Sequence, residues 1–303
     1  MNPTAIDRLR GEVLEKAGLT PEVESAVLHS WELSHTERLT TLDGPLIFKC
    51  ATEPFTHEHD NLTAAWQAGV NVPRLRATTR TPTMLGMLME DLGTPTREAS
   101  DADGIAAAIQ LHSSAAPDFL APGDTEWLRS LPSRALRSLH LLQSERWEDI
   151  DDITVTLQQI EKAAPARAEG ATLRPFGWVH SEFHSESLIV TADGRPFMFD
   201  FARAFRGPGL IDLASWQGTV DAPDPDRMRA LLETYVDEGG PSQTLHDRGG
   251  LSVQNWALGW HRVWVLEWFL DQALLWIADP DDDPAYQRVV RRHATEAASL
   301  LRV

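Results

Sequence analysis

The sequence predicts an α+β protein of two lobes: a small N-terminal lobe with an antiparallel sheet and a larger, mostly helical C-terminal lobe. The chain has 303 residues, which is long for one compact domain and favours two packed lobes. Short strand-like runs are concentrated between residues 23 and 51, whereas the apolar pattern after residue 95 is mostly that of helices. The sequence shows no internal repeat and no low-complexity tract.

The N-terminal lobe is predicted to begin with a helix and to continue as a small antiparallel sheet. Residues 4–18 have the apolar spacing of an amphipathic helix, which ends at Gly18. Asp43-Gly44 is a turn dipeptide that joins two of the strand-like runs into a hairpin. The predicted strands are residues 26–28, 38–42 and 45–50.

A second helix and a further strand complete this lobe. The helix is expected to start near residue 53, to end at 68 and to be closed by Gly69. Residues 84–90 are apolar enough to form a buried strand, and residues 91–95 form a connector. The connector marks the boundary between an N-terminal lobe of residues 1–92 and a C-terminal lobe of residues 93–303.

The C-terminal lobe is predicted to consist of helices that a hairpin interrupts once. The interruption lies within residues 176–201, where Asp193-Gly194 is a turn dipeptide between two short apolar runs, 188–190 and 197–199. The predicted helices span residues 103–115, 124–145, 147–163, 225–238 and 250–278.

The charge of the chain excludes several classes of partner. Against 45 acidic residues stand 27 lysines and arginines, so the formal net charge is −18. Such an acidic chain is not expected to bind nucleic acid through its phosphates or to attach to anionic lipid. Cys50 is the only cysteine, which excludes an internal disulfide and a cysteine-rich metal site. Without a signal-peptide-like stretch or a run of ~18 apolar residues, a cytoplasmic protein is expected.

Polar residues gather at one end of the predicted hairpin. A loop that contains Glu182 and Ser187 precedes one strand, and Asp200 follows the other. Both sets lie at the open end of the hairpin, where their side chains can converge. Such oxygen ligands suit Mg²⁺, which takes one or two carboxylates and completes its shell with phosphate and water. A metal ion would also allow an acidic protein to bind a polyphosphate.

Several segments match motifs that occur in the same order in one group of enzymes. They are Lys49 with Glu58, Met89-Glu90-Asp91-Leu92, Leu111-His112, His180-Ser181-Glu182-Phe183-His184-Ser185-Glu186-Ser187, Phe199-Asp200-Phe201 and Asp212-Leu213-Ala214. Over roughly residues 20–275, the chain resembles the aminoglycoside phosphotransferase and choline kinase family. These small-molecule kinases are related in fold to protein kinases, so the resemblance implies a two-lobed, protein-kinase-like fold.

The resemblance implies a nucleotide site in the N-terminal lobe. Lys49 matches the lysine that grips the nucleotide phosphates, and Glu58 matches the helix glutamate that pairs with this lysine. Glu90 and Leu92 belong to the segment that resembles the interlobe hinge, and they would bind the nucleotide. The implied phosphate donor is ATP or GTP.

The resemblance also assigns roles to the C-terminal motifs. Asp200 and Ser187 would hold Mg²⁺, and Glu182 would orient or deprotonate the hydroxyl of the acceptor. Asp212 would be a buried, hydrogen-bonded support of the catalytic loop. The implied reaction is transfer of the γ-phosphate to a hydroxyl of a small molecule.

Four departures from the family pattern surround this site. The family has Gly, Asp and Asn at the positions of Ser181, Glu182 and Ser187, and residues 29–37, where a loop covers the phosphates, contain no glycine. Every change keeps a polar group, so altered geometry with retained activity is favoured. Two alternatives stay open. One is a partner-dependent kinase of peptide Ser or Thr in a natural-product pathway, and the other is a catalytically silent kinase-like binding protein.

Tryptophans and acids of the C-terminal lobe bear on the acceptor. Four tryptophans form a helical stripe that is expected to pack a core, with an aromatic wall for a cationic or flat acceptor as the alternative: Trp256, Trp260, Trp264 and Trp268. Most acidic clusters are expected to be solvated surfaces. The excess of acids in this lobe favours a cationic acceptor; the clusters lie within residues 148–152, 221–226 and 279–283.

Overall fold

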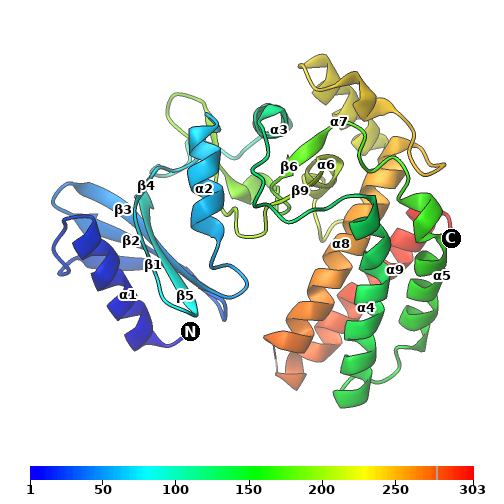
Figure 1. Ribbon diagram of the computed structural model, residues 1–303, viewed down its shortest axis with the longest axis horizontal. Helices are drawn as coiled ribbons and strands as arrows, with labels where there is room; N and C mark the ends of the chain where they lie inside the picture. Colours follow the sequence, from blue (N-terminus) through cyan, green and yellow to red (C-terminus); the bar gives the residue numbers. More distant parts are fainter. Residues whose placement is uncertain (278) are drawn as a thin grey trace. The chain divides into compact units, whose positions relative to one another are not determined.

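The structure is a computed structural model that describes residues 1–277 and 279–303 (Figure 1). It divides into two compact units, and each is discontinuous in sequence: Met1–Asp103 with Ser185–Ala204, and Gly104–His184 with Phe205–Val303. The first unit holds a five-stranded antiparallel sheet and the second most of the helices, which confirms the predicted α+β class. The predicted boundary between residues 92 and 93 stays a prediction, because the units group segments by packing rather than by chain order.

The sheet of the first unit has the strand order β1-β2-β3-β5-β4, with every neighbouring pair antiparallel. The three strands expected between residues 23 and 51 are present, Asp43 lies in the turn between β2 and β3, and the strand at 84–90 is present as β5. The strand β4 was not predicted. The bounds are β1 Glu24–Ser30, β2 Ser34–Thr41, β3 Gly44–Thr52, β4 Leu75–Arg80 and β5 Met84–Glu90.

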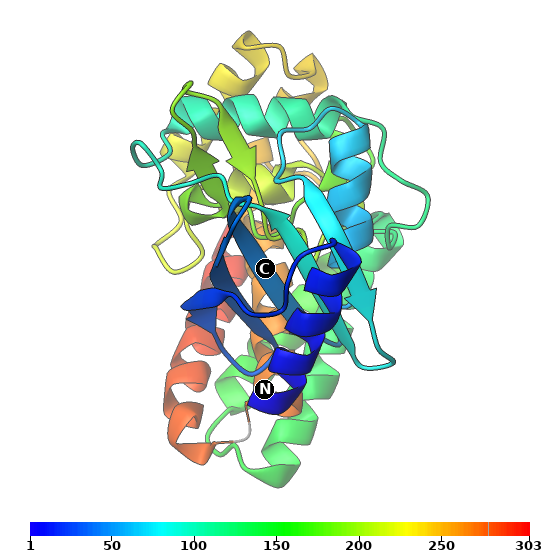
Figure 2. The same cartoon turned by 90° about the vertical axis from the view of Figure 1, so that its left-hand side faces the viewer.

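Two helices accompany this sheet. The predicted N-terminal helix is α1, Pro3–Lys16, which lies across one face of the sheet (Figure 2). Its buried residues pack against Leu39, Phe48 and Leu88, and Gly86 permits the contact because a Cβ there would lie 2.8 Å from Leu9. The second helix, α2, spans Glu58–Gln67 and starts later than predicted. Residues 53–57 form turns instead, in which local side-chain hydrogen bonds compete with the helix.

Cys50 offers a test of the packing between α1 and the sheet. Its side chain is fully buried in the cluster that α1 covers, and burial together with the charge of Glu37 raises the pKa of the thiol to about 12. The thiolate is the reactive form, so a thiol reagent at pH 8 should modify the native protein ~10³-fold more slowly than the urea-unfolded chain. Equal rates before and after unfolding would show that α1 does not cover this face.

The predicted hairpin belongs to the first unit. Its strands are β7, Leu188–Val190, and β8, Pro196–Met198, and they pair with Leu188 opposite Met198. Two backbone hydrogen bonds attach the hairpin to the rest of the unit: Thr96 N–H donates to the Val190 carbonyl at 3.1 Å, and Met198 N–H donates to the Asn71 carbonyl at 2.9 Å. The first bond holds the hairpin near its turn and the second near its open end, so both ends are attached to the rest of the unit.

The second unit is built from helices around a two-stranded sheet of β6 and β9. The predicted helices are present with shifted ends, whereas α6, α9 and both strands were not predicted; residue 278, the last of one predicted helix, lies outside the described residues. No helix in the described part of the chain is both long and apolar enough to cross a membrane. The bounds are α3 Asp101–Ser113, α4 Thr125–Glu145, α5 Asp151–Arg167, β6 Phe176–Val179, β9 Phe205–Pro208, α6 Leu210–Ser215, α7 Pro225–Asp237, α8 Val253–Leu275 and α9 Asp283–Leu301.

The tryptophan stripe lies on α8 and packs the core of the second unit. Trp256 and Trp260 are fully buried, and both indole N–H groups donate to the Arg167 carbonyl, at 2.7 and 3.1 Å. Trp264 is also buried, and its ring centroid lies 5.1 Å from that of Trp127. The core-packing prediction is confirmed for these three tryptophans, and the alternative of an aromatic wall is wrong for Trp256 and Trp260.

Candidate active site

A buried lysine between two carboxylates forms the centre of the site in the first unit. Lys49 Nζ lies 2.7 Å from Glu58 Oε2 and 2.6 Å from Asp200 Oδ1. The predicted ion pair between Lys49 and Glu58 is therefore present. Glu58 is 1% exposed and Asp200 is 42% exposed, so only the second carboxylate is open to solvent.

The three residues come from separate elements whose geometry aims them at one point. Lys49 is in β3 next to Cys50, and because side chains alternate along a strand, the lysine lies on the face opposite the α1 core. Glu58 is the first residue of α2, where the helix dipole favours a negative charge. Asp200 follows β8 with a φ of 66°, a left-handed backbone conformation that aspartate tolerates better than most residues.

The charge of Lys49 is retained in this setting. Burial lowers the pKa of its ammonium, but the charges of Asp200 and Glu58 and the hydrogen bonds to both outweigh that effect, so the net pKa is raised above the ordinary value. The lysine is thus a permanent cation at physiological pH, balanced by two carboxylates.

The lysine lines a cavity of about 320 Å³ within the first unit. Of the six residues predicted to bind nucleotide or metal, all except Ser187 contribute to its walls, and apolar side chains line much of the remainder. Such a space accepts a flat apolar group beside a charged one. The predicted residues on the walls are Lys49, Glu58, Glu90, Leu92 and Asp200, and the apolar ones include Ile47, Leu62, Met89, Ile189 and Phe199.

The segment that was predicted to be the hinge is fixed by an ion pair that the sequence did not reveal. Arg38 Nε and Nη2 lie 2.6 and 3.2 Å from the two carboxylate oxygens of Asp91, which is almost fully buried. Asp91 Oδ1 also accepts the N–H of Gly93 at 2.9 Å. These bonds hold the backbone between Glu90 and Gly93 at the cavity wall. The residues Arg38 and Asp91 stand 53 positions apart, so no local pattern links them.

The connection between β1 and β2, where the family loop covers the phosphates, is a tight turn. Trp31 N–H donates to the Ser34 carbonyl at 3.0 Å, and the Trp31 indole N–H donates to the Ser34 hydroxyl at 2.5 Å. Trp31 and His29 line the cavity. Residues 29–37, which contain no glycine, therefore include a short turn that Trp31 holds by two hydrogen bonds. Trp31 was not predicted to line the site.

Ser187 and Asp200 both stand at the open end of the hairpin, as predicted. Ser187 is buried, and its carbonyl accepts the N–H of Phe199, the residue before Asp200, at 3.2 Å. The described residues contain no group of three or more His, Cys, Asp or Glu side chains that could hold a metal alone. A Mg²⁺ ion bound through a carboxylate, a hydroxyl and nucleotide phosphates needs no such group. The half-exposed carboxylate of Asp200 on the cavity wall fits that type of site.

The second unit contains residues 180–184 of the loop that was predicted to be catalytic, and Asp212 of α6 holds the backbone of this part. Asp212 is fully buried, and its two carboxylate oxygens accept the N–H groups of His180 and Ser181, each at 2.8 Å. A third contact comes from His112 Nε2, 3.1 Å from Asp212 Oδ2. The expectation that Asp212 is a buried, hydrogen-bonded support of the loop is confirmed.

Glu182 lies between two anchored residues of this loop. Its predecessor, Ser181, is held by Asp212, and its successor, Phe183, is fully buried with its ring centroid 6.0 Å from that of His180 and 5.3 Å from that of Trp216. Glu182 itself is half-buried. The loop therefore presents this carboxylate from a backbone fixed on both sides, a condition for positioning a reacting group.

Ser181 occupies the family glycine position in a conformation that glycine adopts more easily. Its φ is 76°, in the left-handed region that costs a residue with a Cβ about 1–2 kcal/mol. We expect Ser181→Gly to be more stable than Ser181→Ala by about 1 kcal/mol, because alanine keeps the strained Cβ and both variants lack the hydroxyl. Urea unfolding of the two variants measures the difference. An alanine variant as stable as the glycine variant would show that the loop carries no such strain.

One carboxylate in each predicted acidic cluster has a structural partner in the second unit. Asp152 pairs with Arg291 at 2.6 Å, and Asp283 pairs with Arg146 at 3.1 Å. Asp224 caps α7 by accepting the N–H of Asp226 at 3.0 Å. These acids stabilise helices and their packing, so they add little support for a cationic acceptor.

Solved structures with the same fold are small-molecule kinases. Spectinomycin phosphotransferase APH(9)-Ia, in complex with ADP and spectinomycin, has a TM-score of 0.63 at 12% identity, covering 100% of this chain and 99% of that one. A thermostable mutant of aminoglycoside phosphotransferase APH(4)-Ia, in a ternary complex with ADP and hygromycin B, has a TM-score of 0.61 at 14% identity, covering 96% of this chain and 99% of that one. Ethanolamine kinase from Plasmodium vivax has a TM-score of 0.62 at 13% identity over 90% and 82%. These similarities confirm the predicted kinase-like fold.

The sequence itself shows the family. It matches no curated protein, but the profile of the phosphotransferase enzyme family (APH) matches residues 29–245. This range includes Lys49, Glu58, Glu182, Asp200 and Asp212, and it covers well over half of the chain. The chain belongs to the APH phosphotransferase enzyme family.

Proposed function

We propose that this protein transfers the γ-phosphate of ATP to a hydroxyl group of a small molecule. The observation that carries the proposal is the Lys49 ammonium between Glu58 and Asp200 on the wall of a partly apolar cavity. This arrangement provides a fixed positive charge for phosphate and an apolar space for a base. Family membership supports a phosphotransferase, and relatives crystallised with ADP or AMP-PNP favour an adenine nucleotide over GTP.

Different residues of the first unit bind the phosphates and the base of the nucleotide. Lys49 binds phosphate oxygens, and Glu58 holds the lysine side chain in place. The backbone from Glu90 to Leu92 contacts the base, because the ion pair of Asp91 fixes that segment at the cavity wall. The tight turn at Trp31 closes the cavity with a side chain where family members use a loop backbone.

Asp200 and Ser187 would hold Mg²⁺ together with the nucleotide phosphates. When bound, the ion neutralises phosphate charge, which suits a chain of net charge −18. Glu182 orients the acceptor hydroxyl and takes up its proton. Glutamate in place of the family aspartate lengthens the side chain by one methylene, and the anchored backbone around Glu182 fixes where the carboxylate can reach.

The acceptor is a small molecule in this proposal. The relatives act on or bind ethanolamine, spectinomycin and hygromycin B, which favours a small hydroxylated compound over a peptide. The net charge of −18 favours a cationic one. Retention of a carboxylate at position 182 and of an ion-paired lysine favours an active enzyme over a silent binding protein.

A thermal-shift titration tests the nucleotide site. Saturating AMP-PNP with Mg²⁺, at 100 times its dissociation constant, should stabilise the protein by ~2.7 kcal/mol. The Lys49→Met variant should lose most of this stabilisation, because methionine keeps the apolar stem and removes the charge. Binding to the variant should weaken by ~10- to 100-fold, the loss of one charge-assisted phosphate contact.

A matched variant distinguishes the loss of the Lys49 charge from the loss of a lysine charge elsewhere on the same unit. Lys16 contacts the Thr78 carbonyl at 3.2 Å on the surface of the same unit, so Lys16→Met should respond to AMP-PNP like the natural protein. If Lys49→Met were stabilised to the same extent as Lys16→Met, the nucleotide phosphates would not bind at Lys49.

A further inference from the structure

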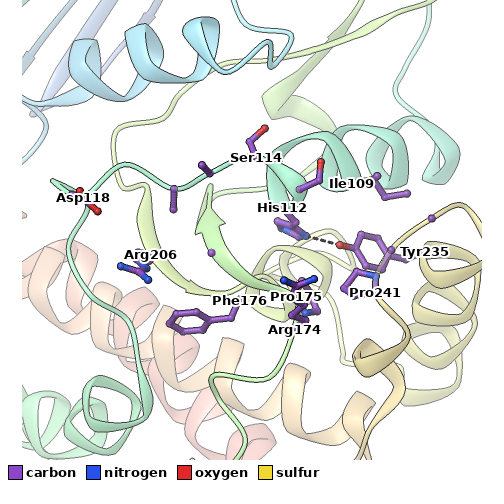
Figure 3. A pocket seen from close by; sticks show the side chains of 16 residues that line it. Ile109, His112, Ser114, Asp118, Arg174, Pro175, Phe176, Arg206, Tyr235 and Pro241 are labelled. Atoms are coloured by element: carbon purple, nitrogen blue, oxygen red, sulfur yellow. Dashed lines mark hydrogen bonds between the residues drawn. The ribbon is translucent and has the colours of Figure 1, made fainter.

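The second unit contains a larger cavity that the proposed reaction does not use. Its volume is about 540 Å³, and its described lining comes from the end of α3, the segment before β6, strand β9 and the segment after α7 (Figure 3). None of the residues predicted to bind nucleotide, metal or acceptor belongs to this lining. The cavity is of the size that encloses a small organic ligand.

The cavity carries an excess of positive charge in an acidic protein. The lining residues include two arginines, Arg174 and Arg206, and one acidic residue, Asp118. Neither guanidinium has an ion pair or hydrogen bond to another side chain or carbonyl within residues 1–277 and 279–303. Both arginines are exposed to solvent at the cavity. Guanidinium groups match carboxylate and phosphate oxygens, so this lining favours an anion even in a chain of net charge −18.

Apolar side chains lie beside these charges. In the view of Figure 3, Phe176 lies between Arg206 and Arg174, and Pro241 and Ile109 lie on the side of Tyr235. The lining therefore offers an apolar surface next to two cations. This combination suits an anionic group attached to a compact apolar body better than a free inorganic ion.

A chain of hydrogen bonds leads from this cavity to the predicted catalytic loop. Tyr235 OH lies 3.1 Å from His112 Nδ1, and His112 Nε2 lies 3.1 Å from Asp212 Oδ2. Burial, aided by the charge of Asp212, raises the pKa of the Tyr235 phenol above its ordinary value, so the hydroxyl stays protonated and donates to His112. His112 then donates to Asp212, which accepts the N–H groups of His180 and Ser181.

Close packing restricts the movement of the Tyr235 and His112 side chains. A Cβ at Gly240 would lie 2.2 Å from Tyr235 Cε1, and a Cβ at Gly209 would lie 2.8 Å from His112 Cε1. Both rings thus rest directly on glycine backbone, and both line the cavity. A ligand that shifts Tyr235 would therefore alter its hydrogen bond and its edge contact with the His112 ring.

We propose that this cavity binds a small organic anion, a carboxylate or phosphate monoester on a compact apolar body, through Arg174 and Arg206. Occupancy is transmitted to the backbone at His180 and Ser181 through Tyr235, His112 and Asp212. The site is an effector site of the second unit. Its existence does not depend on the proposed nucleotide site, because no residue is shared.

Calorimetric titration of the full chain with phenyl phosphate and benzoate tests the binding. At least one of the two should bind with a dissociation constant of ~1 mM or lower, and their cationic counterpart benzylamine should not. The double variant Arg174→Gln with Arg206→Gln should bind the anion at least ~10-fold more weakly. Arg288→Gln, which removes an exposed arginine of α9 from the same unit, should bind it unchanged. Failure of both anions to bind, or equal binding by the double variant, would overturn the proposal.

Hydrogen exchange measured by mass spectrometry tests the connection to the loop. The bound anion should change exchange of the peptide that contains His180 and Ser181 in the natural protein, and the change should be absent in Tyr235→Phe. An anion that binds without altering this peptide would overturn the transmission.

Nucleotide binding provides the control that separates this site from the first. The double arginine variant should keep the AMP-PNP stabilisation of the natural protein. If it lost that stabilisation, the arginines would serve the nucleotide, and the effector site would be refuted. If Lys49→Met kept the AMP-PNP stabilisation while the anion still bound at the arginines, only the nucleotide site of the first unit would be refuted.

Discussion

Replacing Asp200 with asparagine is expected to reduce phosphate transfer by ~10³-fold or more. The substitution removes the one half-exposed carboxylate next to Lys49 and leaves the amide unable to neutralise charge. Asparagine is chosen because it tolerates the left-handed backbone that Asp200 adopts, with φ 66°, so the fold should be retained. Initial rates of ADP formation across a Mg²⁺ titration measure the effect, and the variant should no longer respond to the metal.

The control for this prediction lies in the same hairpin. Asp193 is an exposed carboxylate of the turn between β7 and β8, hydrogen-bonded to Thr191 and paired with Arg195 at 2.7 Å. Asp193→Asn should keep the rate within a factor of about 2, because exposed pairs contribute little. An Asp200→Asn variant that is as active as Asp193→Asn would remove Asp200 from the reaction.

The second large effect is expected from Asp212. Replacing it with alanine leaves the buried donors of His180, Ser181 and His112 without their acceptor, at a cost of about 3–5 kcal/mol in the free energy of unfolding. The loop that carries Glu182 should lose its fixed backbone, so phosphate transfer should fall even where the protein is still folded. Urea unfolding and the transfer assay measure the two effects.

Two further variants sharpen this test. Asp212→Asn keeps one acceptor oxygen and should be destabilised less than alanine. Asp247→Ala, at an exposed position of the same unit, should change the free energy of unfolding by less than about 0.5 kcal/mol. A cost for Asp212→Ala no larger than that for Asp247→Ala would mean that the carboxylate does not hold the loop.

Elements with strong local signals were predictable from the sequence. The turn dipeptides Asp43-Gly44 and Asp193-Gly194 located two hairpins, because few residues adopt such turns easily. The strand β4 was missed, since its sequence LRATTR has no clear alternation and its position depends on pairing with β5 and packing under α1. The helix α9 was missed because Asp, His and Ala occupy four of its seven buried positions, which gives a weak apolar signal.

The residues of the candidate site that belong to sequence motifs were predictable. Lys49, Glu58 and Asp200 were expected from motif order and spacing, and the structure brings them together. The pair of Arg38 and Asp91 and the cavity beside Arg174 depend on contacts between segments far apart in the chain. No spacing along the sequence encodes such contacts, so only the folded structure reveals them.

Two loop residues that depart from the family pattern, Ser181 and Glu182, lie on a backbone that hydrogen bonds and packing hold in place. Ser181 occupies a glycine-like conformation, and its amide is still held by Asp212. Glu182 follows it on an anchored backbone. The framework of the family loop is therefore kept while its reacting side chain is longer, which is the basis for expecting an active enzyme with altered geometry.

Transfer of phosphate to a defined acceptor tests the proposed kinase activity. The protein is incubated with ATP, Mg²⁺ and a panel of hydroxylated amines that includes ethanolamine, spectinomycin and hygromycin B, and products are identified by mass spectrometry. We expect an acceptor heavier by one phosphoryl group, formed in equal amount with ADP and absent with Asp200→Asn. Nucleotide binding at Lys49 with no more ADP formed than by Asp200→Asn, whatever the acceptor, would contradict this expectation and show a silent binding protein.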